Sequence, residues 1–292
     1  MATNNQLLPV RSYVKELLTI LPTVYQVERQ FGRAFQPLQV LDGVEENKTA
    51  FTVKTNDTEV IIGEYDTTAD VNEGNSRFGD MQEIIYANTD VEYDATLRTN
   101  LMLDKTTVNN DFDFAVNQQL VKTGIAYTRQ MNVADGKFLS GAAQKTIELA
   151  DLGDNDEITK MLNDLSAYFV DLEVAVDVTM YVKSELYNAL VDHPLATTGK
   201  NSTVSIDENG IYWFKGFRIE QVPGRYFQEG DLAYLSADGV GIPFIGVVES
   251  RTMMSIDFTG VALQTLSKGG RFVLDDNKKA IAKVTLKDEI GG

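Results

Sequence analysis

Residues 255–286 read SIDFTGVALQTLSKGGRFVLDDNKKAIAKVTL, and this stretch decides how the whole chain is interpreted. Near its end the polar run DDNKK lies between two strand-like runs, GRFVL and AIAKVTL. Asp and Asn tolerate tight-turn dihedrals and bond their own backbone, whereas a calcium loop needs alternating ligands and more oxygens. The two lysines further oppose cation binding. We therefore predict a β-hairpin over residues 270–286, with DDNKK as its polar tip and no bound metal.

The composition is that of an ordinary soluble globular protein. The chain has 292 residues, of which 43% are hydrophobic and 24% charged. No apolar run reaches the length of about 18 residues that a membrane span requires. The first residues, MATNNQLLPVRS, lack the charged and apolar regions of a signal peptide. We therefore expect a protein that is made and kept in a cytoplasm and does not bind a membrane.

The side chains of most catalytic sites are scarce. There is no cysteine, which excludes disulfides, thiolate nucleophiles and cysteine metal ligands. The one histidine, His193, stands directly before Pro194, and we interpret it as a helix-end residue rather than a catalytic one. No phosphate-binding loop, dinucleotide fingerprint, G-x-S-x-G or H-E-x-x-H motif occurs. We predict that the chain is not an enzyme and assign no catalytic, cofactor-binding or metal-binding residues.

The charge is strongly negative. Lys and Arg number 26 against 43 Asp and Glu, a net charge of −17. A surface that binds phosphates needs the opposite sign, so nucleic-acid binding by the surface as a whole is disfavoured. A surface that lies near nucleic acid without adhering to it is compatible with this charge. With so many carboxylates, pairs spaced for glycoside-type hydrolysis arise by chance, so a carboxylate-based hydrolase remains an alternative.

Apolar spacing predicts four helices, at residues 10–21, 105–132, 154–169 and 183–192. The second is the longest and contains Gly124, where it can bend or break. The third begins with the capping-box-like pair Asp154 and Glu157.

Alternation predicts strands at residues 49–55, 58–65, 83–99 and 172–182, and a strand or a strand pair with a glycine break at 211–222. Residues 66–80 are polar and glycine-bearing, which predicts a mobile loop. The block from 46 to 90 therefore has strands but little core of its own, and such a strand pair is marginal in water. We predict one α+β body with an extended excursion that packs on another surface, for example that of another copy of the chain.

The C-terminal stretch resembles the end of major capsid proteins from tailed bacteriophages of Gram-positive hosts. The matching residues are Asp257, Phe258, Gly260, Leu263, Gln264, Asp275, Asp276, Asn277, Lys278, Lys279, Ala280 and Ile281. Residues 241–260, GIPFIGVVESRTMMSIDFTG, also fit the family's approach to this tail. The ordered patterns extend from residue 241 to residue 286.

This resemblance implies a Hong Kong 97-type phage capsid fold of the α+β class. In that fold the N-terminal arm would be 1–45 and the extended hairpin loop 46–90. The peripheral domain with its long spine helix would be 91–150, and the axial domain 151–250. Residues 251–292 would return to the peripheral domain.

The resemblance also implies a function. The chain would be a major capsid protein that assembles with itself, as hexamers and pentamers, into an icosahedral shell around double-stranded DNA that it does not bind specifically. It would be part of the virion capsid and assemble in the host bacterial cytoplasm. A portal protein would be a partner, and a decoration protein is left open.

Two further expectations concern scaffolding and alternatives. Only about forty residues precede the extended loop, so scaffolding is expected to be a separate protein. The alternatives within the shell class are a bacterial nanocompartment, which would enclose a protein cargo, and another virion part such as a tail protein.

Overall fold

A computed structural model describes residues 29–41, 49–56, 60–68, 76–104, 112–197, 204–207, 210–254 and 259–287. The chain divides into two compact units. The first, here called the body, comprises Met1–Glu46 and Tyr93–Gly292, and the second, the extended segment, is Asn47–Glu92. The helix predicted at 10–21 lies outside the described residues.

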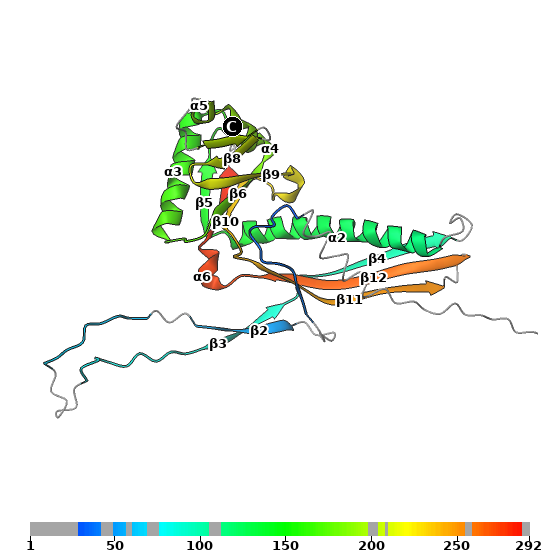
Figure 1. Cartoon of the computed structure of the whole chain (residues 1–292), viewed down its shortest axis with the longest axis horizontal. Coiled ribbons are helices and arrows are strands. Elements are labelled where there is room, and N and C mark those ends of the chain that lie inside the picture. The colour runs from blue at the N-terminus through cyan, green and yellow to red at the C-terminus, as the bar shows by residue number, and fades with distance from the viewer. Residues whose placement is uncertain are drawn as a thin grey trace, which may run out of the picture. The chain divides into compact units, whose positions relative to one another are not determined.

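The body contains a four-stranded sheet of order β1-β11-β12-β4. Its strands are β1 (Gln39–Val40), β11 (Ile242–Met254), β12 (Gly260–Phe272) and β4 (Ala95–Asp104). β1 is parallel to β11, and the other pairs are antiparallel. Helix α2 (Phe112–Ala142) runs along one face of this sheet (Figure 1). Leu120 and Tyr127 of this helix pack with Leu263 of β12 in a buried cluster.

Helix α2 is longer than the sequence predicted. It continues through Gly124 without a break and extends ten residues past the predicted end at 132, whereas residues 105–111 lie outside the described ranges. Gly136 lies in the part of α2 beyond the predicted end, and glycine lowers helix propensity. A Cβ at that position would lie 1.9 Å from the carbonyl oxygen of Tyr226, which belongs to the short 3-10 helix η2 (Gly224–Tyr226). A residue that weakens a helix locally is required here by close packing.

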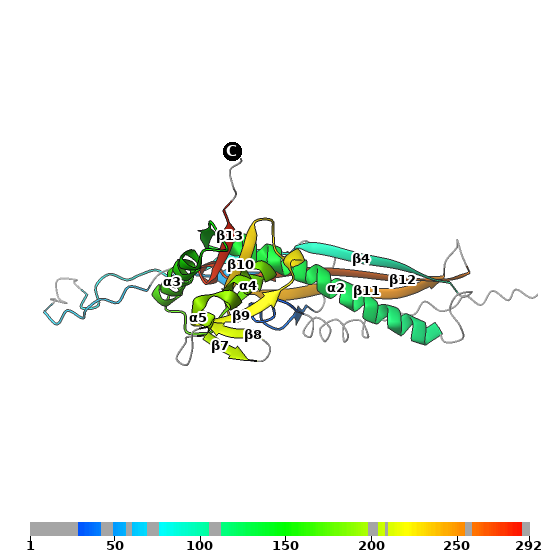
Figure 2. The same cartoon turned by 90° about the horizontal axis from the view of Figure 1, so that it is seen from above.

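A seven-stranded sheet gathers at one end of α2 (Figure 2). In spatial order its strands are β5 (Lys145–Leu149), β13 (Ile281–Leu286), β10 (Asp231–Ala237), β6 (Val178–Lys183), β9 (Phe217–Val222), β8 (Gly210–Phe214) and β7 (Val204–Asp207). Helices α3 (Asn155–Asp171), α4 (Ser184–Asp192) and α5 (Pro194–Thr197) accompany it, and side chains of α3 and α4 share a buried cluster with the sheet. A third cluster packs Phe31 and Phe35 with Leu139 of α2 and Tyr181 of β6.

Helix α3 confirms the sequence prediction and its cause. Its apolar positions, from Ile158 to Phe169, are buried. The Asp154 side chain accepts hydrogen bonds from the backbone N–H groups of Asp156 and Glu157, as an N-cap should. The Glu157 carboxylate instead accepts from Ala150 and Asp151, so it fixes the preceding turn and does not complete a capping box. Helix α4 also matches its prediction.

The hairpin predicted over residues 270–286 is wrong. The two runs belong to different sheets, since β12 pairs with β11 and β4, whereas β13 pairs with β10 and β5. The DDNKK run forms most of the connection between them, and Asp275–Lys278 makes one helical turn, α6. Strands β12 and β13 each have two neighbouring strands in this arrangement, whereas an isolated hairpin would give each of them one. Tertiary pairing therefore overrides the local turn signal.

Two strand predictions need smaller corrections. Residues 83–99 contain two strands, because β3 (Ala87–Glu92) pairs with β2 (Thr49–Thr55) and β4 joins the four-stranded sheet. In the run 172–182 only the part from Val178 onward is a strand, because a turn with Glu173 at positive φ follows α3.

The extended segment is built on the antiparallel pair β2 and β3, which confirms the strand at 49–55. Residues 60–66 continue without forming a strand, so the prediction of a strand at 58–65 fails where it is described. In the predicted loop, residues 66–68 and 76–80 contain turns, and 69–75 lie outside the described ranges.

Candidate assembly surface

The extended segment presents a dense apolar surface to solvent. Its exposed large apolar side chains are Val60, Ile61, Ile62, Tyr65, Phe78, Met81, Ile84, Ile85 and Tyr86. Ile62 is 94% exposed and Met81 is 100% exposed. Large apolar side chains that are exposed in such number within one segment indicate an interaction site in a soluble protein. We call these nine residues the apolar surface of the extended segment.

Contacts between its two sides hold the described part of this segment together. The backbone N–H of Asp66 donates to the carbonyl of Arg77 at 3.0 Å, and the Gln82 side chain accepts from the N–H of Ile61 at 3.2 Å. The rings of Tyr65 and Phe78 meet edge to face at 5.0 Å between centroids. All three buried apolar clusters found among the described residues lie in the body. The segment is therefore positioned by backbone pairing and local contacts rather than by a core of its own.

This arrangement can gain free energy by association. Burying one side chain of the size of Ile or Met contributes about 1.5–3 kcal/mol when it leaves water completely. A few such side chains, held along one extended ribbon, supply a large contact without any pocket. The surface is therefore suited to contact with another apolar surface.

A buried ionic cluster in the body joins four parts of the chain. Asp135 of α2 receives Arg271 of β12 at 2.5 Å and Arg29 at 3.4 Å, and all three side chains are buried. Arg271 also donates to the carbonyl of Met131 at 2.8 Å and lies 3.7 Å from Asp94, which precedes β4. This cluster ties the segment before β1 and the start of β4 to the helix and the sheet.

The pKa of the Asp94 carboxyl in this cluster is raised. Partial burial raises its pKa above the ordinary value, and the nearby Arg271 guanidinium opposes this shift without cancelling it. Protonation of Asp94 is therefore easier in the folded state than in the unfolded chain.

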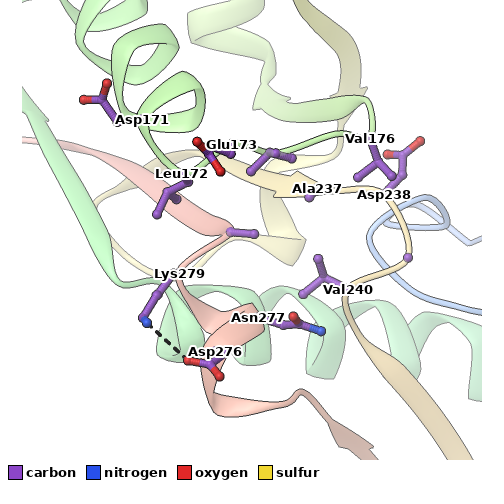
Figure 3. Close-up of a pocket in the computed structure, with 13 residues that line it drawn as sticks. Asp171, Leu172, Glu173, Val176, Ala237, Asp238, Val240, Asp276, Asn277 and Lys279 are labelled. Atoms are coloured by element: carbon purple, nitrogen blue, oxygen red, sulfur yellow. Dashed lines mark hydrogen bonds and ion pairs between the residues drawn. The ribbon is translucent and has the colours of Figure 1, made fainter. Parts of the chain in front are cut away.

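The DDNKK run lines an open groove of about 620 Å³ in the body. Figure 3 shows Asp171 and Glu173 near the end of α3, Asp238 after β10, and Asp276 with Lys279 on and after α6. Lys279 pairs with Asp276 at 3.2 Å on the surface. Throughout the described ranges, no three acidic or histidine side chains are grouped closely enough to hold a metal ion.

His193 lies at the C-terminal cap of α4, as the sequence predicted. Its Nδ1 accepts from the backbone N–H of Leu195 at 3.1 Å, which leaves the proton on Nε2. Nε2 lies 3.0 Å from the carbonyl of Asn155 and 3.1 Å from the Thr159 hydroxyl. The buried ring thus ties the end of α4 to the start of α3.

The apolar surface was anticipated only in part. The sequence located a coreless excursion at 46–90, and the structure supplies the exposed side chains. The ionic cluster was not anticipated, because no local pattern relates Arg29, Asp135 and Arg271. More than a hundred residues separate Arg29 from Asp135, and more than a hundred separate Asp135 from Arg271.

Comparison with known proteins gives a clear answer for the fold. No protein-family model matches the sequence, and no curated protein matches it. Solved structures do match. The capsid of the cyanophage P-SCSP1u has a TM-score of 0.64 at 10% identity, covering 86% of this chain and 87% of that one. The mature capsid of bacteriophage PhiM1 has a TM-score of 0.61 at 10% identity, covering 85% and 84%.

The chain has the Hong Kong 97-type capsid fold. A virus-like particle from Pyrococcus furiosus matches as well, with a TM-score of 0.54 at 14% identity, covering 93% of this chain and 99% of that one. The predicted fold class, α+β with a long helix, is confirmed. Within the described part of this Hong Kong 97-type chain, no helix combines the length and apolarity needed to cross a membrane.

Proposed function

We propose that the chain is the major capsid protein of a tailed bacteriophage and assembles into an icosahedral shell around double-stranded DNA. The observation that carries the proposal is the apolar surface of the extended segment, on a fold shared with phage capsids. A closed shell needs large contacts between copies. In this proposal the apolar side chains of the extended segment become buried when another copy covers them. The proposal includes no catalytic role for the chain.

In this proposal the parts of the fold have separate tasks. Residues 1–45 act as the arm, 46–90 as the extended loop, 91–150 as the peripheral domain with α2 as the spine helix, 151–250 as the axial domain and 251–292 as the return. The partners are other copies in hexamers and pentamers, a separate scaffolding protein and a portal protein. A Gram-positive host rests only on the resemblance of the C-terminal stretch.

A second candidate is a shell of the same fold with a protein cargo. The match to the Pyrococcus furiosus virus-like particle, across 99% of that chain, supports this second candidate. Particles isolated from the native cell distinguish the two. Nuclease-protected double-stranded DNA inside the particle supports the phage capsid, whereas a protease-protected protein without DNA supports the nanocompartment.

The first experiment is the mass and shape of the purified chain, by light scattering and negative-stain microscopy, over a range of salt and crowding and with its candidate scaffolding protein. Closed shells, or rings of five or six subunits, are expected. A stable monomer or dimer under every condition, the scaffold included, would contradict the proposal.

A further inference from the structure

The exposed side of α2 carries a stripe of positive charge. Lys122, Arg129 and Lys137 are exposed, and we call these three residues the basic stripe. At 1.5 Å and 100° per residue, they span about 22 Å along the helix and about 80° of its circumference. They therefore form one narrow row rather than three unrelated surface charges.

The stripe is not neutralised by the described part of the chain. None of its three side chains has an ion-pair or hydrogen-bond partner among the described residues. The side chains described on α2 include one carboxylate, that of Asp135, and it is buried between Arg29 and Arg271. Exposed amide side chains, Gln118 and Gln130, lie beside the stripe and add hydrogen-bond donors without negative charge.

The stripe is an exception in a chain of net charge −17. Helix α3 illustrates the usual pattern, because it carries Asp156, Glu157, Asp164 and Asp171 against one cation, Lys160. A narrow row of unpaired cations on an otherwise acidic protein is suited to a linear polyanion whose recognition does not depend on sequence. A duplex phosphate backbone has this form, and amide donors beside the cations also bind phosphate oxygens.

We propose that the basic stripe of α2 contacts the phosphate backbone of the enclosed DNA, so that this side of the helix faces the contents of the shell. The proposal rests on the function proposed above and adds a surface to it. Three phosphate contacts release about three counterions, which gives a slope near −2.7 for log K against log salt. Affinity should then fall about 40-fold between about 50 mM and about 200 mM salt, a weak contact that lets DNA move during packaging.

The test uses the full chain and a fluorescent 30-base-pair duplex of arbitrary sequence, followed by anisotropy at several salt concentrations. The stripe variant combines Lys122→Gln, Arg129→Gln and Lys137→Gln. The matched control combines Lys54→Gln, Arg98→Gln and Lys160→Gln, which changes the net charge equally but removes exposed cations from three other elements.

We expect the stripe variant to lose at least about tenfold in affinity at low salt, with a slope near zero, and the control to stay within about threefold of the wild type. Equal losses in both variants, or no duplex binding by the wild type at low salt, would overturn the proposal. Competition with polyglutamate is a further test. If polyglutamate displaces the labelled duplex at a lower concentration of negative charge than unlabelled duplex does, the stripe prefers an acidic protein and the proposal is wrong.

Duplex binding is measured on the unassembled chain, and shell formation by the same preparations is measured separately. If wild type and both variants form shells but the stripe makes no difference to duplex binding, the inference alone fails. If the wild type forms no shells with or without scaffold, the proposed function fails whatever the duplex experiment gives.

Discussion

The body and the extended segment use the same kinds of side chain in opposite ways. In the body, Ile158, Met161 and Leu165 of α3 are buried to within 2% of completely. In the extended segment, Ile62 and Met81 are almost fully exposed. Folding of the body is explained by the apolar surface that it buries, whereas the extended segment leaves large apolar side chains exposed, and in the proposed shell another copy covers them. The following predictions test that contrast, from the largest expected effect to the smallest.

The largest effect is expected from charges placed on the apolar surface of the extended segment. Ile62→Asp combined with Met81→Asp should abolish shell formation, because an ionised carboxylate is very costly to bury in an apolar contact. The free energy of unfolding of the body should change by less than about 0.5 kcal/mol, since both side chains are exposed. Microscopy and urea denaturation measure the two quantities.

The matched control is Ile62→Leu combined with Met81→Leu, which keeps the surface apolar and should still form shells. Normal shells from the aspartate variant would show that this surface is not an assembly contact and would remove the contrast between the two regions.

Within the body, the largest loss of stability is expected at the ionic cluster. Asp135→Ala removes the buried carboxylate that Arg271 and Arg29 share, and breaking a buried pair in this way costs about 3–5 kcal/mol. Asp171→Ala removes an exposed carboxylate and should cost less than about 0.5 kcal/mol. Chemical denaturation of both variants decides the point, and equal stabilities would mean that the cluster is open to water.

A core truncation on α3 should have a similar or smaller effect. Leu165→Ala removes a fully buried side chain and should cost about 2–5 kcal/mol. Val170→Ala, on the same helix but 71% exposed, should change the free energy of unfolding by less than about 0.5 kcal/mol. An unchanged melting temperature for Leu165→Ala would show that α3 does not contribute to the core.

Asp94 should make a small contribution to the free energy of unfolding, and this contribution should fall as the pH rises. Its folded-state pKa is raised, so the folded state binds the proton more tightly than the unfolded chain does. Relative to Asp94→Asn, the wild type should therefore lose stability as pH rises from the ordinary Asp pKa, about 3.9, through the folded value. Urea midpoints across this interval measure the difference. A gain in relative stability would mean that attraction to Arg271 outweighs burial.

The smallest effect is expected at the connection between the two sheets. Asp276 is exposed on α6, and its ion pair with Lys279 lies on the surface. Asp276→Ala should change the free energy of unfolding by less than about 0.5 kcal/mol. Thermal melting checks this, and the loss of a metal ion from the purified protein on this substitution would show that DDNKK is more than a connection.

The sequence alone determined the elements whose signals are local. Apolar spacing and the N-cap at Asp154 specified α3, and Pro194 marked the end of α4, because helix periodicity and capping depend on neighbours a few residues away. The residue types also indicated that the segment 46–90 is extended and lacks an apolar core of its own. The patterned C-terminal stretch indicated the capsid fold, although the hairpin predicted for part of it was wrong.

Only the tertiary structure decided which distant segments meet. It separated β12 from β13, extended α2 to Ala142 through glycines, and placed Asp135 between two arginines. It also decided that Lys122, Arg129 and Lys137 are on the solvent side of α2 while Val116 and Leu120 are on the sheet side. The physical reason is that strand pairing, close packing and charge burial depend on partners far away in the chain, whose identity no local pattern contains.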